Sequence, residues 1–166
     1  RTVLSVVSAN ADESMWETLH AMAKEETSSL LRDQYYGLIA STRNEALAQR
    51  ALDMALTDEP GATNSAMMIS RVAREFPDKA YDFAIANMSK LDGLVDGSSR
   101  TRYFPRLASG SADPAMVGKL RDYAEKHLAP TSRREVETAI AGIEYRIKVR
   151  RERLPEIDAW LKKRGS

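Results

Sequence analysis

Apolar residues recur along this chain at spacings of three and four, which is the period of a helix packed on one face. Asp12 precedes the first such segment, and its carboxylate can accept hydrogen bonds from the free backbone N–H groups of a first helical turn. We therefore predict a helix that begins after Asp12. Its inward stripe is expected to be Met15, Trp16, Leu19, Met22 and Ala23.

The same period continues through most of the chain. Further helices are predicted from about Ser28, after Asn44, from about Asn64, at Pro77, over 100–107, from Asp113, and in a long last segment with apolar positions from Val136 through Leu154 and Ile157 to Leu161. The helix from Ser28 is expected to bury Leu31, Tyr35, Leu38 and Ile39.

Three segments interrupt this pattern. Asp58–Gly61 has the composition of a turn, because proline fixes φ and glycine tolerates the conformation that follows. Pro155 is predicted to kink or restart the last helix, since proline removes a backbone hydrogen bond. Val3–Val7 is the only stretch with the character of a strand.

The chain contains a weak internal repeat. Ala11-Asp12 aligns with Ala112-Asp113, and the five stripe positions that follow match in register. Repeated amphipathic helices that cannot bury their apolar faces alone favour stacking side by side. The predicted fold is therefore all-α, with stacked antiparallel helix pairs forming an α-α superhelix of the HEAT or armadillo type. The competing geometry is a compact bundle of the same helices.

Composition sets the broad class of the protein. The chain has 166 residues, 43% hydrophobic and 30% charged, with a net charge of +1. This is the balance of a soluble globular protein, and it leaves the compartment open between cytoplasmic and exported. Nothing in it calls for nucleic acid or a membrane as a partner. We expect one helical-repeat domain over residues 1–166, cut from a longer protein, because the chain opens at Arg1 without a signal-like segment.

The residues offer little catalytic chemistry. Cysteine is absent, which excludes a disulfide framework and a thiolate metal site. His20 and His127 have no histidine partner one helical turn away, and a His-Glu-x-x-His motif is absent. No nucleophile elbow, P-loop or Rossmann glycine pattern is present. We therefore predict no catalytic residue and no metal ligand in this chain.

Two basic clusters are candidate contact surfaces. The first consists of Arg146, Lys148, Arg150, Arg151 and Arg153. It is either a nucleic-acid stripe or, as the near-zero net charge favours, a solvated face paired with Glu144 and Glu152. The second cluster lies around Tyr103 and Phe104, and it could hold a peptide carboxylate or simply face solvent. Its candidate peptide-contact residues are Arg100, Arg102 and Arg106.

Several segments of the sequence resemble a known protein family. Lys79–Leu91 resembles a segment typical of the C-terminal helical domain of the aminopeptidase N family of zinc aminopeptidases, although Tyr81 and Met88 stand where tryptophans are common. Residues 114–128 and 133–161 resemble the closing helices of that domain, and the ending Arg153–Leu161 matches its usual finish.

This resemblance implies a parent enzyme that removes N-terminal amino acids from peptides with one zinc ion. In that family the zinc ligands and the Gly-x-Met-Glu-Asn loop lie in an upstream catalytic domain, so no catalytic residue is carried over to this chain. The implied role is a non-catalytic superhelix that covers the active-site chamber, with that catalytic domain and the peptide as partners. The chain would be the distal part of a larger C-terminal domain.

Two other functions stay open on the sequence alone. The same fold would suit a stand-alone helical-repeat scaffold that binds another protein along its concave side. A nucleic-acid-binding repeat protein would use the basic helix around Arg150.

Overall fold

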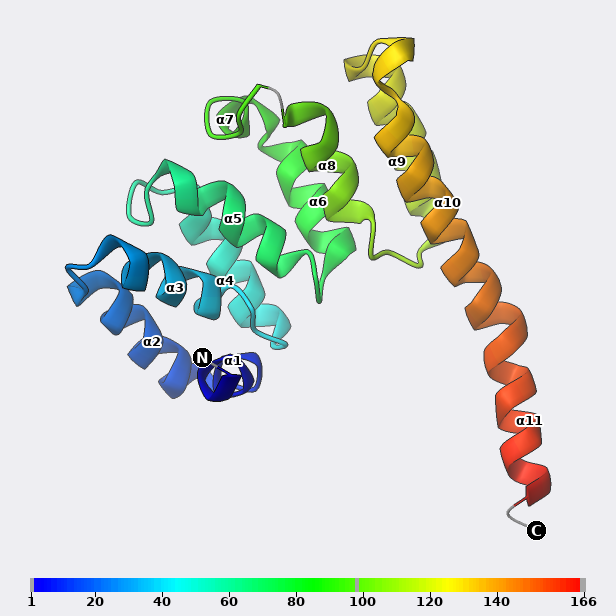
Figure 1. The fold of residues 1–166 in the computed structure, drawn as a ribbon, viewed down its shortest axis with the longest axis horizontal. Coiled ribbons are helices and arrows are strands. Elements are labelled where there is room, and N and C mark those ends of the chain that lie inside the picture. The colour runs from blue at the N-terminus through cyan, green and yellow to red at the C-terminus, as the bar shows by residue number, and fades with distance from the viewer. Residues whose placement is uncertain (1, 98, 165–166) are drawn as a thin grey trace.

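The computed structural model describes residues 2–97 and 99–164, and all regular structure in these ranges is helical (Figure 1). In chain order the elements are α1 (Thr2–Ala9), α2 (Glu13–Glu25), α3 (Ser29–Ile39), α4 (Glu45–Ala55), α5 (Ala62–Val72), α6 (Pro77–Ala86), α7 (Met88–Leu91), α8 (Arg100–Ala108), α9 (Pro114–His127), η1 (Pro130–Ser132), α10 (Arg134–Lys148), η2 (Val149–Arg153) and α11 (Leu154–Arg164). The predicted all-α fold is confirmed.

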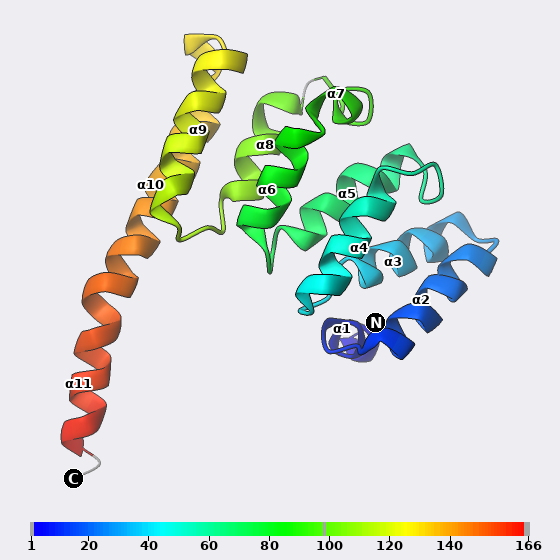
Figure 2. The same ribbon diagram turned by 180° about the vertical axis from the view of Figure 1, so that it is seen from behind.

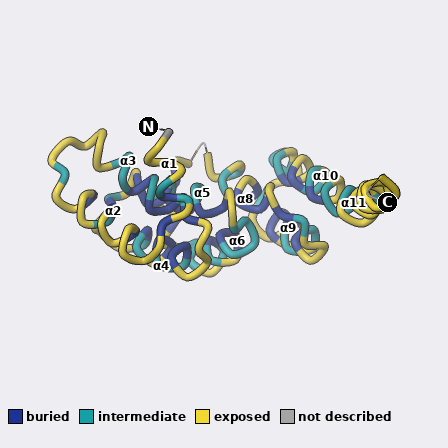
Figure 3. The backbone as a smooth tube through the Cα atoms, turned by 90° about the horizontal axis from the view of Figure 1, so that it is seen from below, coloured by how far each residue is buried: buried dark blue, intermediate teal, exposed yellow. Residues whose placement is uncertain are grey.

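The helices pack as consecutive pairs. α2 packs on α3, α4 on α5, α6 on α8, and α9 on α10. Contacts between pairs run from α3 to α5, from α5 to both α6 and α8, and from α8 to both α9 and α10, with α1 joining at the N-terminal end. Seen from below, α3, α5, α8 and α10 form one row and α2, α4, α6 and α9 the other (Figure 3). The pairs are stacked side by side, as the repeat predicted (Figure 2).

Local side-chain chemistry fixes several of the helix starts. The carboxylate of Asp12 accepts from Met15 N at 2.8 Å, and that of Asp113 accepts from Ala115 N at 2.9 Å. Asn44 accepts from Ala46 N at 2.9 Å. Gly61 precedes α5 with a φ of 77°, which a side chain would strain. The predicted caps and the repeated Ala-Asp helix start are confirmed.

The core is continuous through the stack and rich in small residues. Helix α4 buries Ala48, Ala51 and Ala55 completely, so neighbouring helices can approach its backbone closely. Trp16 is the bulkiest buried residue near the N-terminal end, and its indole N–H donates to the Ile39 carbonyl oxygen at 3.0 Å. This bond satisfies the one polar group of the side chain and joins α2 to the end of α3.

The strand prediction for Val3–Val7 is wrong, because these residues lie in α1. Helix α1 contacts α2 and α3, which offer no free strand edge to pair with. A lone strand there would leave its backbone groups without partners, whereas a helix satisfies them internally. Tertiary packing thus overrides the strand preference of the valines.

Two of the predicted inward stripes are partly wrong. In α2, Trp16 and Leu19 are buried, but Met15 and Met22 are each 40% exposed. In α3, Leu31 is exposed, and Tyr36 is buried in its place. The inward face of α3 is set by the large Tyr36 and Ile39 three positions apart, which turns Leu31 away from the core.

The sequence predicts that Pro155 kinks or restarts the last helix; in the structure the helix continues from α10 into α11 through a change of hydrogen-bond pattern just before this proline (Figure 1). Leu154 N donates to the Val149 carbonyl oxygen five residues back, so η2 is a π-helical turn. A π turn accommodates a proline because it rearranges the hydrogen bonds that the ring disrupts. Beyond this turn the expected burial fails, since the apolar residues of α11 are about half exposed.

Buried tyrosines make the fold sensitive to alkaline pH. Burial, and then the charge and hydrogen bond of Glu59, raises the pKa of Tyr36 to about 12. Burial, and then the charge of Asp92, raises the pKa of Tyr123 to about 12. Burial also raises the pKa of Tyr81 and Tyr103, whose hydroxyls donate to the carbonyl oxygens of Lys119 and Ala66.

A tyrosine whose pKa is higher in the folded protein stabilises the fold fully below the unfolded pKa of about 10, and this stability is lost as pH rises through the folded pKa. We therefore expect the free energy of unfolding to fall between pH 10 and 12, because ionisation then favours the unfolded chain. Urea unfolding at pH 8, 10 and 11, with tyrosinate absorbance at 295 nm, measures this fall. Tyr36→Phe should flatten it, and unchanged stability up to pH 11.5 would contradict the expectation.

Candidate functional site

A groove lies between α1, α3 and α5, in the row of helices that connects the pairs. Its volume is about 780 Å³, and its apolar lining comes from all three helices. These residues are Leu4, Leu30, Leu38 and Met67. The groove therefore offers an apolar surface large enough for several side chains of a partner.

Charged and polar groups rim this groove near both ends of α5. Asp33 accepts from Asn64 Nδ2 at 2.7 Å, and Glu75 lies 3.6 Å from Arg43 Nε, so both carboxylates have partners. Within the described ranges, the guanidinium groups of Arg71 and Arg74 make no hydrogen bond or ion pair. Two cations beside an apolar channel can accept a carboxylate or carbonyl groups together with an apolar side chain.

A glycine lets α5 approach α3 beneath the groove. A Cβ at Gly37 would lie 3.6 Å from Met67 Sδ and 3.9 Å from Arg71 Nε. These are ordinary contact distances, so alanine fits there, but a longer side chain would enter the groove. Gly37 therefore keeps the floor of the groove open.

The three arginines predicted as peptide contacts all lie on α8, but their side chains have different surroundings. Arg100 turns back to its own loop, where its Nε donates to the Val95 carbonyl oxygen at 3.3 Å and its Nη2 donates to the Asp92 carbonyl oxygen. Arg102 and Arg106 are exposed one helical turn apart, and neither side chain has a polar partner in the described part of the chain. They lie on α8, which packs against the groove helix α5.

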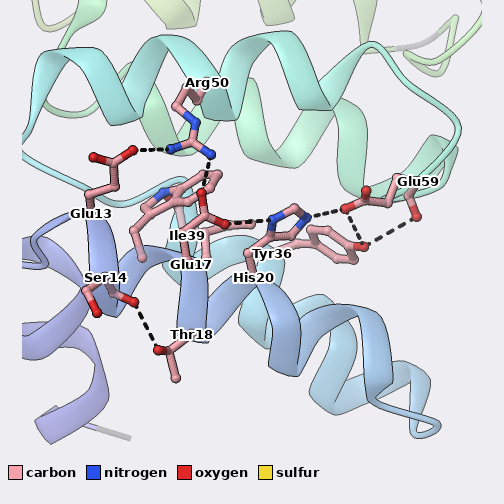
Figure 4. Close-up of polar contacts among 10 residues, drawn as sticks. Glu13, Ser14, Glu17, Thr18, His20, Tyr36, Ile39, Arg50 and Glu59 are labelled. Atoms are coloured by element: carbon pink, nitrogen blue, oxygen red, sulfur yellow. Dashed lines mark hydrogen bonds and ion pairs between the residues drawn. The ribbon is translucent and has the colours of Figure 1, made fainter.

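His20 belongs to a polar network that ties α2 to the α4–α5 pair (Figure 4). Its Nε2 lies 2.6 Å from Glu59 Oε1, and its Nδ1 lies 3.7 Å from Glu17 Oε2. Tyr36 donates to the same Glu59 carboxylate at 3.3 Å, and Arg50 pairs with Glu17. Each of these side chains is thus bonded to another one in the network. The network therefore holds the helices together and is not an open binding site.

The other basic and histidine candidates also have local partners. His127 stacks on Tyr123 with ring centroids 5.3 Å apart. Arg146 donates to the carbonyl oxygens of Ser109 and Ser111, and Arg151 pairs with Glu152 at 2.7 Å. Part of the basic cluster thus serves the packing of α10 or pairs along the helix.

The side chains of the described residues do not fit a zinc ion. Among residues 2–97 and 99–164, no group of three or more histidine, cysteine, aspartate or glutamate side chains is placed to hold a metal. None of the helices described is both long enough and apolar enough to cross a membrane.

The groove is the feature that sequence patterns missed. Its apolar lining comes from three helices separated by 20 or more residues, and no spacing rule links them. The one local signal is Leu30, an exposed leucine on the side of α3 opposite Ile39.

The chain matches a model of a known protein family. Residues 1–145 match the model described as the ERAP1-like C-terminal domain. No curated protein matches the chain. The match covers the helix pairs from α1 to most of α10, and it agrees with the resemblance to the C-terminal helical domain of aminopeptidases. The chain therefore belongs to the ERAP1-like C-terminal domain family.

Proposed function

We propose that this chain is the non-catalytic C-terminal domain of a zinc aminopeptidase, in which it covers the active-site chamber and contacts the peptide. The observation that carries this proposal is the family match over residues 1–145. In this proposal the zinc ion and the residues that bind it belong to the upstream catalytic domain of the same polypeptide. The helical stack supplies a wall and a set of cationic side chains.

The α1 end of the stack supports the placement as a distal part of a larger domain. At the α1 end, Val3 and Val6 are 75% and 59% exposed. An apolar end face suits a further helix packed on α1, so we place the missing part of the domain there.

The proposed peptide contacts are Arg102 and Arg106, together with Arg71 and Arg74 at the rim of the groove. All four lie on α8, on α5 or directly after α5, and none has a carboxylate partner among the described residues. A guanidinium group donates several hydrogen bonds in a fixed plane, which suits peptide carbonyls and a terminal carboxylate. Arg100 is left out, because its own loop already engages it.

Kinetics on the intact parent enzyme test these contacts. In Arg102→Ala/Arg106→Ala we expect kcat/KM for peptides of about ten residues to fall roughly tenfold, which corresponds to about 1.4 kcal/mol. Hydrolysis of a single aminoacyl-coumarin should not change, since it does not reach these side chains. Arg121→Ala/Lys126→Ala on α9 is the matched control. Unchanged kinetics on the long peptides would remove α8 from the proposed contact surface.

The groove itself favours a second function, a stand-alone scaffold that binds another protein. An apolar channel of about 780 Å³ between repeat helices is a common docking surface for peptides. The two functions share the fold, so the fold does not distinguish them. The size and zinc content of the complete gene product do.

A further inference from the structure

The groove between α1, α3 and α5 carries opposite charges at its two ends. Beside the start of α5 lies Asp33, whose carboxylate accepts from Asn64 Nδ2 at 2.7 Å. Beside the end of α5 the lining includes Arg71 and Arg74. Helices α3 and α5 pack against each other, so the anionic and the cationic end belong to one channel (Figure 1).

The charges at neither end are neutralised. Within the described ranges, Asp33 pairs with no lysine, arginine or histidine, and its hydrogen-bond partner is a neutral amide. Arg71 and Arg74 pair with no carboxylate there. Glu75 also lines the cationic end, but it lies 3.6 Å from Arg43 Nε, so this end keeps an excess of positive charge.

Between the charged ends the channel is apolar. Leu38 and Met67 line it, and Gly37 keeps its floor open, because a Cβ there would lie 3.6 Å from Met67 Sδ. A methionine side chain adapts to apolar groups of different shapes. The channel therefore has room for an apolar side chain between a carboxylate and two guanidinium groups.

The spacing of the charges sets the size of the ligand. Asn64, which holds Asp33, precedes Arg71 by about 10 Å and Arg74 by about 15 Å along a helix axis. An extended peptide spans about 3.3–3.6 Å per residue, so three or four residues bridge this distance. The two ends of such a peptide are an ammonium and a carboxylate, which are complementary to the two ends of the groove.

We propose that the groove binds a free peptide of three or four residues, with its ammonium group on Asp33 and its carboxylate on Arg71 and Arg74. An apolar side chain of the peptide lies over the groove floor. Because both ends of the peptide are held here, this ligand differs from a long substrate whose first residue lies in a catalytic domain. It would compete with the long substrate for the two arginines. The binding does not rest on the proposed function, since every group in it belongs to this chain.

NMR titration of the isotope-labelled 166-residue chain gives both the affinity and the place of binding. We expect Ala-Leu-Ala to shift the amide signals of α3 and α5. Acetylating its amino group or amidating its carboxyl group should each weaken binding about tenfold, because each removes one charged contact. Peptides of two and six residues should bind more weakly than those of three and four.

Charge-removing variants test the orientation of the peptide. Asp33→Asn keeps an oxygen that accepts from Asn64 but removes the charge, so acetylation of the peptide should no longer matter in this variant. In Arg71→Gln/Arg74→Gln, amidation should no longer matter. Glu125→Gln, an exposed position on α9, is the control and should bind like the unmodified chain. The modified peptides test the same contacts on the unmodified chain, so the test does not depend on the folding of a variant.

Three results would overturn the inference. The first is the absence of shifts in α3 and α5 at about 10 mM Ala-Leu-Ala, far above a micromolar dissociation constant. The second is equally tight binding of the free and the acetylated or amidated peptides. The third is tighter binding of a ten-residue peptide, which would mean that the groove takes only one end of a long chain and would leave the proposed function standing. A parent enzyme without zinc or activity would contradict the proposed function alone.

Discussion

Replacing Trp16 by alanine is expected to lower the free energy of unfolding by about 3–5 kcal/mol. The side chain is 1% exposed, and its indole N–H holds the Ile39 carbonyl oxygen at 3.0 Å. Truncation leaves a cavity between α2 and α3 and an unpaired carbonyl group, and it removes the ring on which Arg50 stacks at 4.5 Å. Urea unfolding followed by circular dichroism at 222 nm measures the loss.

The second tryptophan provides the matched control. Trp160 on α11 is half exposed, and Arg164 stacks on its ring at 4.3 Å. In the 166-residue chain, Trp160→Ala should change the free energy of unfolding by no more than about 0.5 kcal/mol. Equal losses for the two variants would mean that the stack does not bury Trp16 as described.

Replacing Phe104 by alanine should destabilise the C-terminal half of the stack by a similar amount, about 3–5 kcal/mol. Phe104 is buried on α8, with ring centroids 5.4 Å from both Tyr103 and Tyr123. The Tyr123 contact joins the α6–α8 pair to the α9–α10 pair. Because repeat proteins transmit stability between neighbours, loss of this contact should also uncouple the two halves.

Hydrogen exchange resolves this uncoupling along the chain. In Phe104→Ala, amides of α9 and α10 should exchange faster than those of α2–α5, whereas the unmodified chain should show one cooperative core. Tyr145 is 68% exposed on α10, so Tyr145→Ala is the control and should leave both halves unchanged. Uniformly faster exchange over the whole stack in Phe104→Ala would show that the Phe104–Tyr123 contact does not divide the stack into two cooperative halves.

The helix starts could be predicted from the sequence because their causes are local. Asp12, Asn44 and Asp113 each cap a helix within three residues of themselves. The repeat of the Ala-Asp start likewise needed only comparison of the chain with itself. The fold class and the stacked pairs follow from these short-range signals.

The groove and the exposed face of α11 could not be predicted in this way. The groove depends on how α1, α3 and α5 come together, which no periodicity encodes. For α11, the apolar stripe predicts burial, but periodicity does not say whether the covering surface belongs to the same chain. The strand prediction for Val3–Val7 failed for a related reason, since a run of five apolar residues fits a strand or a helix equally well.

Arg100, Arg102 and Arg106 show the same limit within one helix. Their spacing placed them on α8 correctly, yet only the structure distinguishes Arg100, which bonds to its loop, from the two that stay open. A side chain's partners depend on the path of residues 92–95, and sequence patterns do not describe the path of a loop.

The most direct test of the central claim is the zinc content and aminopeptidase activity of the complete gene product that contains this chain. The account predicts one zinc ion per polypeptide by mass spectrometry of the metal, release of coumarin from aminoacyl-coumarin substrates, and loss of that activity on chelation with recovery on adding zinc. The 166-residue chain alone should bind no zinc and cleave nothing. A complete product of about this length, with neither zinc nor activity, would contradict the account and favour the stand-alone scaffold.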